Sequence, residues 1–146
     1  MKSIYSLELE KYPSRALSGR NKRVKNAKTA KHLKERLEYA MMYLCVGQPA
    51  GLAAPQIGLR YQACFVREIF MVNPVIINKW GRHDSVEGCY SKRGRSYKVR
   101  RWNGVTVIFQ DEYLETVQAD FEHRMADIVQ HEIDHLNGVT IMDKGE

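Results

Sequence analysis

The stretch DIVQHEIDHLNG, residues 127–138, constrains the fold more than any other part of the chain. His131 and His135 are four residues apart, so a helix would place both imidazoles on one face, one turn apart. Such a pair can bind one divalent metal ion while Glu132, which directly follows the first histidine, stays free as a general base. Two ligands do not make a site, so the fold must bring a third ligand to this helix.

Cys89 is the best candidate for the third ligand. The residues after His135 contain no histidine, whereas Cys89 lies upstream in EGCYS, next to a glycine that permits a tight turn. A thiolate is a strong ligand for Zn²⁺ or Fe²⁺. Cys45, expected in a helix, and Cys64, in an apolar strand, are typical of small core residues. The remaining histidines have no partner pattern and are expected at the surface: His32, His83 and His123.

Length and composition fit one globular domain over residues 1–146. Hydrophobic residues make up 44% and charged residues 27%, which argues against disorder. No apolar run approaches the roughly 20 residues that span a bilayer, and the N-terminus lacks the apolar core of a secretion signal. Three cysteines without framework spacing favour a reducing compartment. We therefore expect a cytoplasmic protein that does not bind membranes.

Hydrophobic periodicity predicts two helices with short strands between them. Apolar residues recur at helical spacing over about residues 24–44, and glycine and proline then end this helix at 47–51. The β-type runs are 61–66, 70–77, 97–102, 105–109 and 114–119. A last helix should begin near Asp120, a plausible N-cap, and end at Asn137 before Gly138. This order predicts an α+β fold with largely antiparallel sheets packed around a central helix that carries the HExxH-type motif.

The net charge of +6 is concentrated near the N-terminus. Residues 1–48 hold 11 Lys/Arg and 4 Asp/Glu, whereas residues 49–146 hold 12 and 13. The excess lies mainly in residues 15–36. This basic segment could face a polyanion such as ribosomal RNA, or it could be a solvated helix face after a flexible lead-in. No nucleic-acid motif accompanies the charge, and DNA is not an expected partner.

Three segments together resemble the sequence motifs of the peptide deformylase family. They are GLAAPQIG at 51–58, EGCYS at 87–91 and HEIDH at 131–135, in the family's order. HExxH alone is a moderate signal, but the combination is highly specific. The family removes the N-formyl group from the initiator methionine of nascent polypeptides and releases formate. The resemblance covers the chain from about Ala30 to Asp143.

The resemblance implies a metal centre and a role for the residues around it. The ligands would be Cys89, His131 and His135, with water in the fourth position. The metal would be Fe²⁺ in the cell, with Ni²⁺ or Zn²⁺ as substitutes. Glu132 would take a proton from the attacking water and pass it to the leaving amine. Gln56 and the backbone N–H of Tyr90 would donate hydrogen bonds to the oxyanion.

The resemblance also implies a peptide-binding groove beside the metal. The segment 51–58 would provide a strand edge that pairs with the substrate. The substrate-binding residues would be Ala50, Gly51, Glu87, Gly88 and Ile128. Glu87 and Arg101 could orient a metal ligand, or they could form an ordinary salt bridge.

Several positions depart from the family's pattern and put the substrate preference in doubt. In the loops near the site these are Pro49, Ala50, Tyr90 and Lys92-Arg93. On the last helix, Arg124 and Asp127 replace mainly apolar pocket residues, and they could pair with each other or alter the methionine pocket. The chain also ends soon after Asp143, without the C-terminal helix of many bacterial members. This compact form suggests a minimal, virus-borne version.

Two other functions are compatible with these residues. A metalloprotease of the HExxH type would cleave ordinary peptide bonds. A non-catalytic RNA- or ribosome-binding module would keep a structural zinc with a fourth protein ligand. The expected function is metal-dependent deformylation of N-formyl-methionyl peptides and nascent chains.

Overall fold

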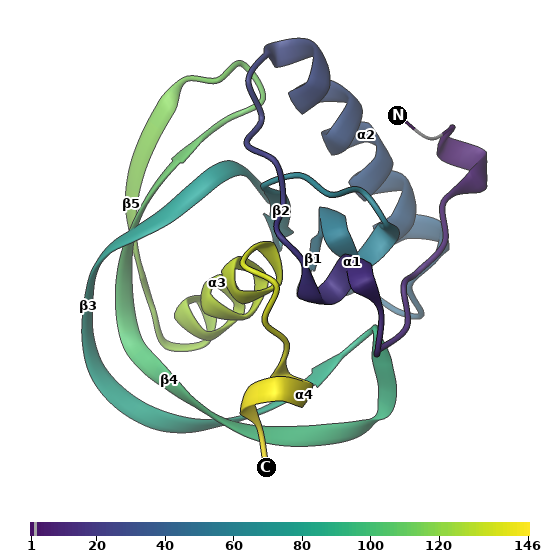
Figure 1. Cartoon of the computed structure of the whole chain (residues 1–146). Helices are drawn as coiled ribbons and strands as arrows, with labels where there is room; N and C mark the ends of the chain where they lie inside the picture. Colours follow the sequence, from purple (N-terminus) through teal and green to yellow (C-terminus); the bar gives the residue numbers. More distant parts are fainter. Residues whose placement is uncertain (2) are drawn as a thin grey trace.

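The computed structural model describes residue 1 and residues 3–146, and its framework is a five-stranded antiparallel sheet (Figure 1). The strands are β1 (Gly51–Ala53), β2 (Ala63–Val66), β3 (Ile69–Cys89), β4 (Lys92–Gln110) and β5 (Thr116–Glu122). They are hydrogen-bonded in the order β1-β2-β3-β4-β5, so each strand pairs with its neighbour in sequence. The predicted α+β class with antiparallel pairing is confirmed.

The hairpin of β3 and β4 is much longer than the sequence pattern predicted. The runs 97–102 and 105–109 form one strand, and the run 70–77 continues as far as Cys89. Polar residues dominate these extensions and conceal the alternation of a strand. Three register shifts interrupt the pairing, the last between Glu87 and Cys89. Such bulges bend strands, and Figure 1 shows the sheet curving around a helix.

That enclosed helix is α3 (His123–Leu136), which carries the HExxH-type motif (Figure 1). Its apolar face packs on the sheet in a cluster that includes Ala126, Val129, Leu136, Val105, Val107 and Phe109. The prediction for its start was wrong, because Asp120 lies in β5 and accepts a hydrogen bond from Thr106 Oγ1 at 2.6 Å. Its end was predicted correctly, with Asn137 as the C-cap and Gly138 at a φ of 76°.

The predicted N-terminal helix is α2 (Ala27–Tyr43), which packs against β1 and β2. Asn26 caps it by accepting a hydrogen bond from the Thr29 N–H at 2.8 Å. Its buried face consists of Ala30, Leu33, Leu37 and Ala40. Cys45 lies just beyond the helix and is buried, so only its expected place within the helix was wrong.

Short helical turns complete the chain. They are η1 (Ile4–Ser6), α1 (Arg15–Ser18), η2 (Ala54–Ile57) and α4 (Ile141–Lys144), and none was predicted. The resemblance implied a strand edge over residues 51–58, but only Gly51–Ala53 form a strand, and the turn η2 directly follows it. On α4, Ile141 packs with Cys89, Tyr97 and Val99 at the far end of the β3–β4 hairpin. Within the described residues, no helix has the length and apolarity needed to cross a membrane.

Candidate metal centre and substrate pocket

The three predicted metal ligands lie together between two elements. Cys89 ends β3, and His131 and His135 lie on α3. One donor atom from each lies within 4.8 Å of the other two, and Cys89 Sγ is 3.4 Å from His135 Nε2. No fourth histidine, cysteine or carboxylate belongs to this cluster among the described residues. Three protein ligands with a fourth position left for water or substrate are typical of catalytic metal sites.

The protonation state of the buried His135 also fits a divalent cation. Burial lowers the pKa of His135 well below its ordinary value, so its imidazole is neutral and keeps a lone pair for a metal. The other two cysteines lie outside the cluster. Burial raises the pKa of Cys45 to about 11 and that of Cys64 well above its ordinary value, so both remain thiols. Their interpretation as core residues agrees with the structure.

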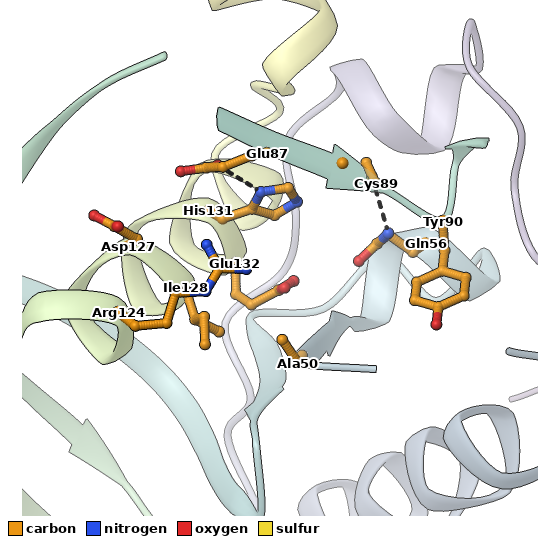
Figure 2. A pocket seen from close by; sticks show the side chains of 12 residues that line it. Ala50, Gln56, Glu87, Cys89, Tyr90, Arg124, Asp127, Ile128, His131 and Glu132 are labelled. Carbon is orange, nitrogen blue, oxygen red and sulfur yellow. Dashed lines mark hydrogen bonds and ion pairs between the residues drawn. The ribbon is translucent and has the colours of Figure 1, made fainter. Parts of the chain in front are cut away.

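A buried ionic network orients His131. Arg101, which is 1% exposed, donates to both carboxylate oxygens of Glu87 at 2.9 and 2.7 Å, and to Asp134 at 2.7 Å. Burial alone would raise the pKa of Glu87, but its hydrogen bonds with Arg101 and His131 hold the pKa well below its usual range. Glu87 Oε1 lies 3.0 Å from His131 Nδ1. Figure 2 shows the imidazole between Glu87 and Cys89, with its other nitrogen on the cluster side.

Glu132 lies beside the ligands and is available for proton transfer. It is 4% exposed, and its Oε1 has no hydrogen-bond partner among the described residues. Burial raises its pKa to about 7. The neighbouring β1 permits this position only because residue 51 is a glycine. A Cβ on Gly51 would lie 2.8 Å from Glu132 Oε2 and 2.7 Å from the Phe65 carbonyl oxygen.

The side-chain amide of Gln56 faces the cluster in a fixed orientation. Its Oε1 accepts a hydrogen bond from the Ala53 N–H at 3.0 Å, so Nε2 faces Cys89 Sγ at 3.5 Å and Ser91 Oγ at 3.4 Å (Figure 2). The 3-10 turn η2 produces this geometry by folding Gln56 back over β1. Gln56 is 2% exposed, unlike an ordinary surface glutamine.

Tyr90 connects the two sides of the site. Its hydroxyl donates to the Val46 carbonyl oxygen at 2.6 Å, which ties the end of β3 to the loop before β1. The bridge depends on the Tyr90 hydroxyl, and Tyr90 is one of the positions at which the sequence departs from the family's pattern.

A cavity of about 100 Å³ opens beside the cluster. Its wall contains Ala50, Gly51, Gln56, Glu87, Gly88, Cys89, Tyr90, Arg124, Asp127, Ile128, His131 and Glu132 (Figure 2). All five predicted substrate-binding residues are among them. The two unusual α3 residues are also among them, so these departures do lie at the pocket.

Sequence reasoning missed the partner of one histidine. His83 was expected at the surface without a partner, but its Nε2 lies 2.9 Å from Asp127 Oδ1. Contacts with Asn103 and Asp127 raise the pKa of His83 and so favour the charged imidazole. Asp127 thus pairs with His83 rather than with Arg124. A usable signal was the two-residue spacing of His83, Ser85 and Glu87, which places all three on one face of β3.

Comparisons with known proteins give the same picture as the site. A model of the polypeptide deformylase family matches residues 6–146. Peptide deformylase of Heliobacterium modesticaldum is 38% identical over 107 residues, covering 70% of this chain and 71% of that protein. Peptide deformylase 1 of Bacillus anthracis is 34% identical over 146 residues, covering 94% and 91%.

Solved structures extend the similarity to the fold. A probable peptide deformylase from Synechococcus phage S-SSM7 superposes with a TM-score of 0.87 at 29% identity, over 95% of this chain and 99% of that one. Because the family model covers nearly the whole chain and its three motifs converge on one buried cluster, this chain belongs to the polypeptide deformylase family.

Proposed function

We propose that this protein is a metal-dependent peptide deformylase that removes the N-formyl group from formyl-methionyl peptides and releases formate. The observation that carries the proposal is the buried cluster of Cys89, His131 and His135 with the buried Glu132 beside it, in a chain of this family. The cluster opens into a cavity, so a peptide's N-terminus can reach it.

The residues divide the chemistry between them. A divalent cation held by Cys89, His131 and His135 would supply Lewis acidity, which activates water and polarises the formyl carbonyl. Glu132 then takes the proton of the attacking water and delivers it to the departing amine. Its Oε1 has no hydrogen-bond partner among the described residues, so the protein does not engage the carboxylate through that atom.

Two donors serve the oxygen of the formyl group as it gains negative charge. The amide of Gln56 is held with Nε2 toward the cluster, so it needs no reorientation during the reaction. The backbone N–H of Tyr90 is the second donor in this proposal. The bond of its side chain to Val46 restrains the turn that carries this N–H.

The substrate backbone lies along β1, which is an edge strand of the sheet. Gly88 leaves room for a close approach, since a Cβ there would have no protein atom within 4 Å, and Gly51 borders the same cavity. Ile128 and Ala50 provide the apolar wall for the first side chain. Glu87 borders the same cavity and orients His131 through the contact of its Oε1 with Nδ1 of the imidazole.

A direct assay separates this function from its two rivals. Formate release from formyl-Met-Ala-Ser, without cleavage of casein, is expected of a deformylase. Casein cleavage without formate release would indicate a metalloprotease. Tightly bound zinc without any turnover would indicate a structural module. We propose Fe²⁺ as the native metal because the resemblance to the family implies it. Imidazole and thiolate ligands also suit Zn²⁺, and metal analysis after anaerobic purification distinguishes the two.

We also propose that the enzyme acts in the cytoplasm on nascent chains and that its basic segment contacts ribosomal RNA. Four of its cations are exposed: Lys22, Arg23, Lys25 and Lys28. Their combined replacement by glutamine should reduce co-sedimentation with ribosomes, most clearly at low salt, and leave turnover of short peptides unchanged. The matched control replaces the exposed cations Lys79, Arg82, Lys98 and Arg100. Equal co-sedimentation of both variants and the unchanged protein would favour a merely solvated surface.

A further inference from the structure

The acidic side chains in the pocket wall are already engaged by the protein. Glu87 is bound by Arg101 and faces His131. Asp127 is paired with His83 at 2.9 Å. Apart from the buried Glu132, the wall therefore offers no free negative charge to an incoming cation.

Arg124 differs from these residues. It lies in the first turn of α3, is exposed and borders the pocket. Its guanidinium forms no hydrogen bond or ion pair with the described residues. Figure 2 shows the guanidinium on the pocket side of α3, directed away from the carboxylate of Asp127. A positive charge without a partner thus faces the space that the peptide enters.

The opposite side of the site is also positive. A second, open cavity of about 350 Å³ shares Gly88, Cys89 and Tyr90 with the first, so the two are adjacent. Lys92, Arg93 and Arg95 line its remaining wall and are exposed. The segment 88–96 contains no acidic residue. Cations from two distant parts of the chain therefore border the same site.

We propose that these cations select formylated peptides that carry an acidic side chain shortly after the formyl-methionine. The inference rests on the proposed deformylase function and names the substrate class within it. A carboxylate is the peptide side-chain group that pairs with a guanidinium through two charge-assisted hydrogen bonds.

The geometry points to the third residue of the substrate as the main partner of Arg124. Side chains of an extended peptide alternate, so the first and third residues face the same side. The first side chain packs beside Ile128 on α3, and the third is then displaced by roughly 7 Å toward the outside. Arg124 precedes Ile128 by four residues, a displacement of roughly 6 Å along the axis. A long arginine side chain can cover the difference.

The test compares short peptides that differ only in charge. We expect the kcat/KM of formyl-Met-Ala-Asp to exceed that of formyl-Met-Ala-Lys by roughly five-fold or more at low salt, and the ratio to shrink as salt rises. Formyl-Met-Asp-Ala and formyl-Met-Lys-Ala should show a smaller ratio. Arg124→Leu should reduce the preference and Arg124→Glu should reverse it. Arg23→Leu, an exposed arginine outside the pocket, should leave it unchanged.

A second measurement is independent of turnover. The product peptides Met-Ala-Asp and Met-Ala-Lys are titrated by calorimetry against the unchanged protein, Arg124→Glu and the double variant Lys92→Gln/Arg93→Gln. Tighter binding of the acidic peptide, lost in the variants, supports the proposal. Equal kcat/KM and equal affinity for both charges would overturn it. If no peptide released formate, the proposed function would fail, and the calorimetric comparison would still decide the charge preference.

Discussion

The two ends of the pocket along α3 are built in opposite ways. At the inner end, burial holds His135, and a network in which Arg101 holds Glu87 with two hydrogen bonds orients His131. At the outer end, the first turn of α3 presents Arg124 to solvent, without a hydrogen bond or ion pair to any residue that the structure describes. Groups held by buried partners keep one geometry, which bond-breaking chemistry needs. We expect an exposed charge to contribute only a modest preference among substrates. A single substitution can change this preference without abolishing deformylation.

The largest expected effect is the loss of metal and activity when any of the three ligands is replaced, in contrast to replacement of a cysteine outside the cluster. Cys89→Ala, His131→Ala and His135→Ala should each remove most bound metal and abolish formate release, because each deletes one of three protein ligands. Cys45→Ala is the matched control, since Cys45 is buried but lies outside the cluster. Metal content is measured by elemental analysis and activity by formate release. Full metal in Cys89→Ala together with its loss from Cys45→Ala would show that the wrong cysteine was assigned.

The next effect separates metal binding from proton transfer at the inner end. Glu132→Gln keeps the size of the side chain but cannot accept a proton. Metal content and the affinity for a formyl-Met peptide should therefore be nearly unchanged, while kcat falls by about 10²–10⁴-fold. Elemental analysis, calorimetry and formate release give the three quantities.

Each alternative outcome for Glu132→Gln has a distinct meaning. A fully metallated variant with near-normal kcat would contradict the proposed mechanism. Loss of the metal would instead identify Glu132 as a ligand or as support for one.

The two ends of the pocket also differ in how far the sequence could predict them. The inner end follows from local patterns: the four-residue spacing fixes His131 and His135 on one helix face, and EGCYS marks Cys89. The Arg101–Glu87 network that orients His131 could not be predicted without knowing the strand register, because the two residues meet only through the pairing of β3 with β4. From the sequence alone, an ordinary salt bridge between Glu87 and Arg101 was as good an interpretation as a role in orienting a metal ligand.

The fold shows the same division between local and long-range information. Periodicity located α2 and the end of α3 because apolar faces and caps are local signals. It divided the β3–β4 hairpin into pieces, because polar residues on its outer face conceal the strand. It also placed Asp120 in a helix, although pairing with Thr106 holds it in β5. The partner of His83 was missed because the contact is also long-range: Asp127 lies on α3, far from His83 in the sequence.

The smallest expected effects come from two glycines that border the same pocket. Gly51→Ala would bring a Cβ within 2.8 Å of Glu132 Oε2 and 2.7 Å of the Phe65 carbonyl oxygen, so either backbone or carboxylate must move. Overpacking of this kind typically costs about 1–3 kcal/mol, and the displaced Glu132 should also lower kcat. Thermal unfolding and steady-state kinetics measure the two effects.

Gly88→Ala is the matched change at the open side of the pocket. A Cβ there meets no protein atom within 4 Å, so the melting temperature and metal content should stay close to those of the unchanged protein. The added methyl group would instead occupy space left for the peptide backbone, so KM should rise while kcat changes little. If Gly88→Ala destabilised the fold while Gly51→Ala left both stability and kcat unchanged, the contrast between a packed wall at Gly51 and an open wall at Gly88 would be wrong. A rise in KM confined to Gly88→Ala would locate the substrate backbone between β1 and the end of β3, because only a bound peptide can sense a methyl group that the protein itself does not touch.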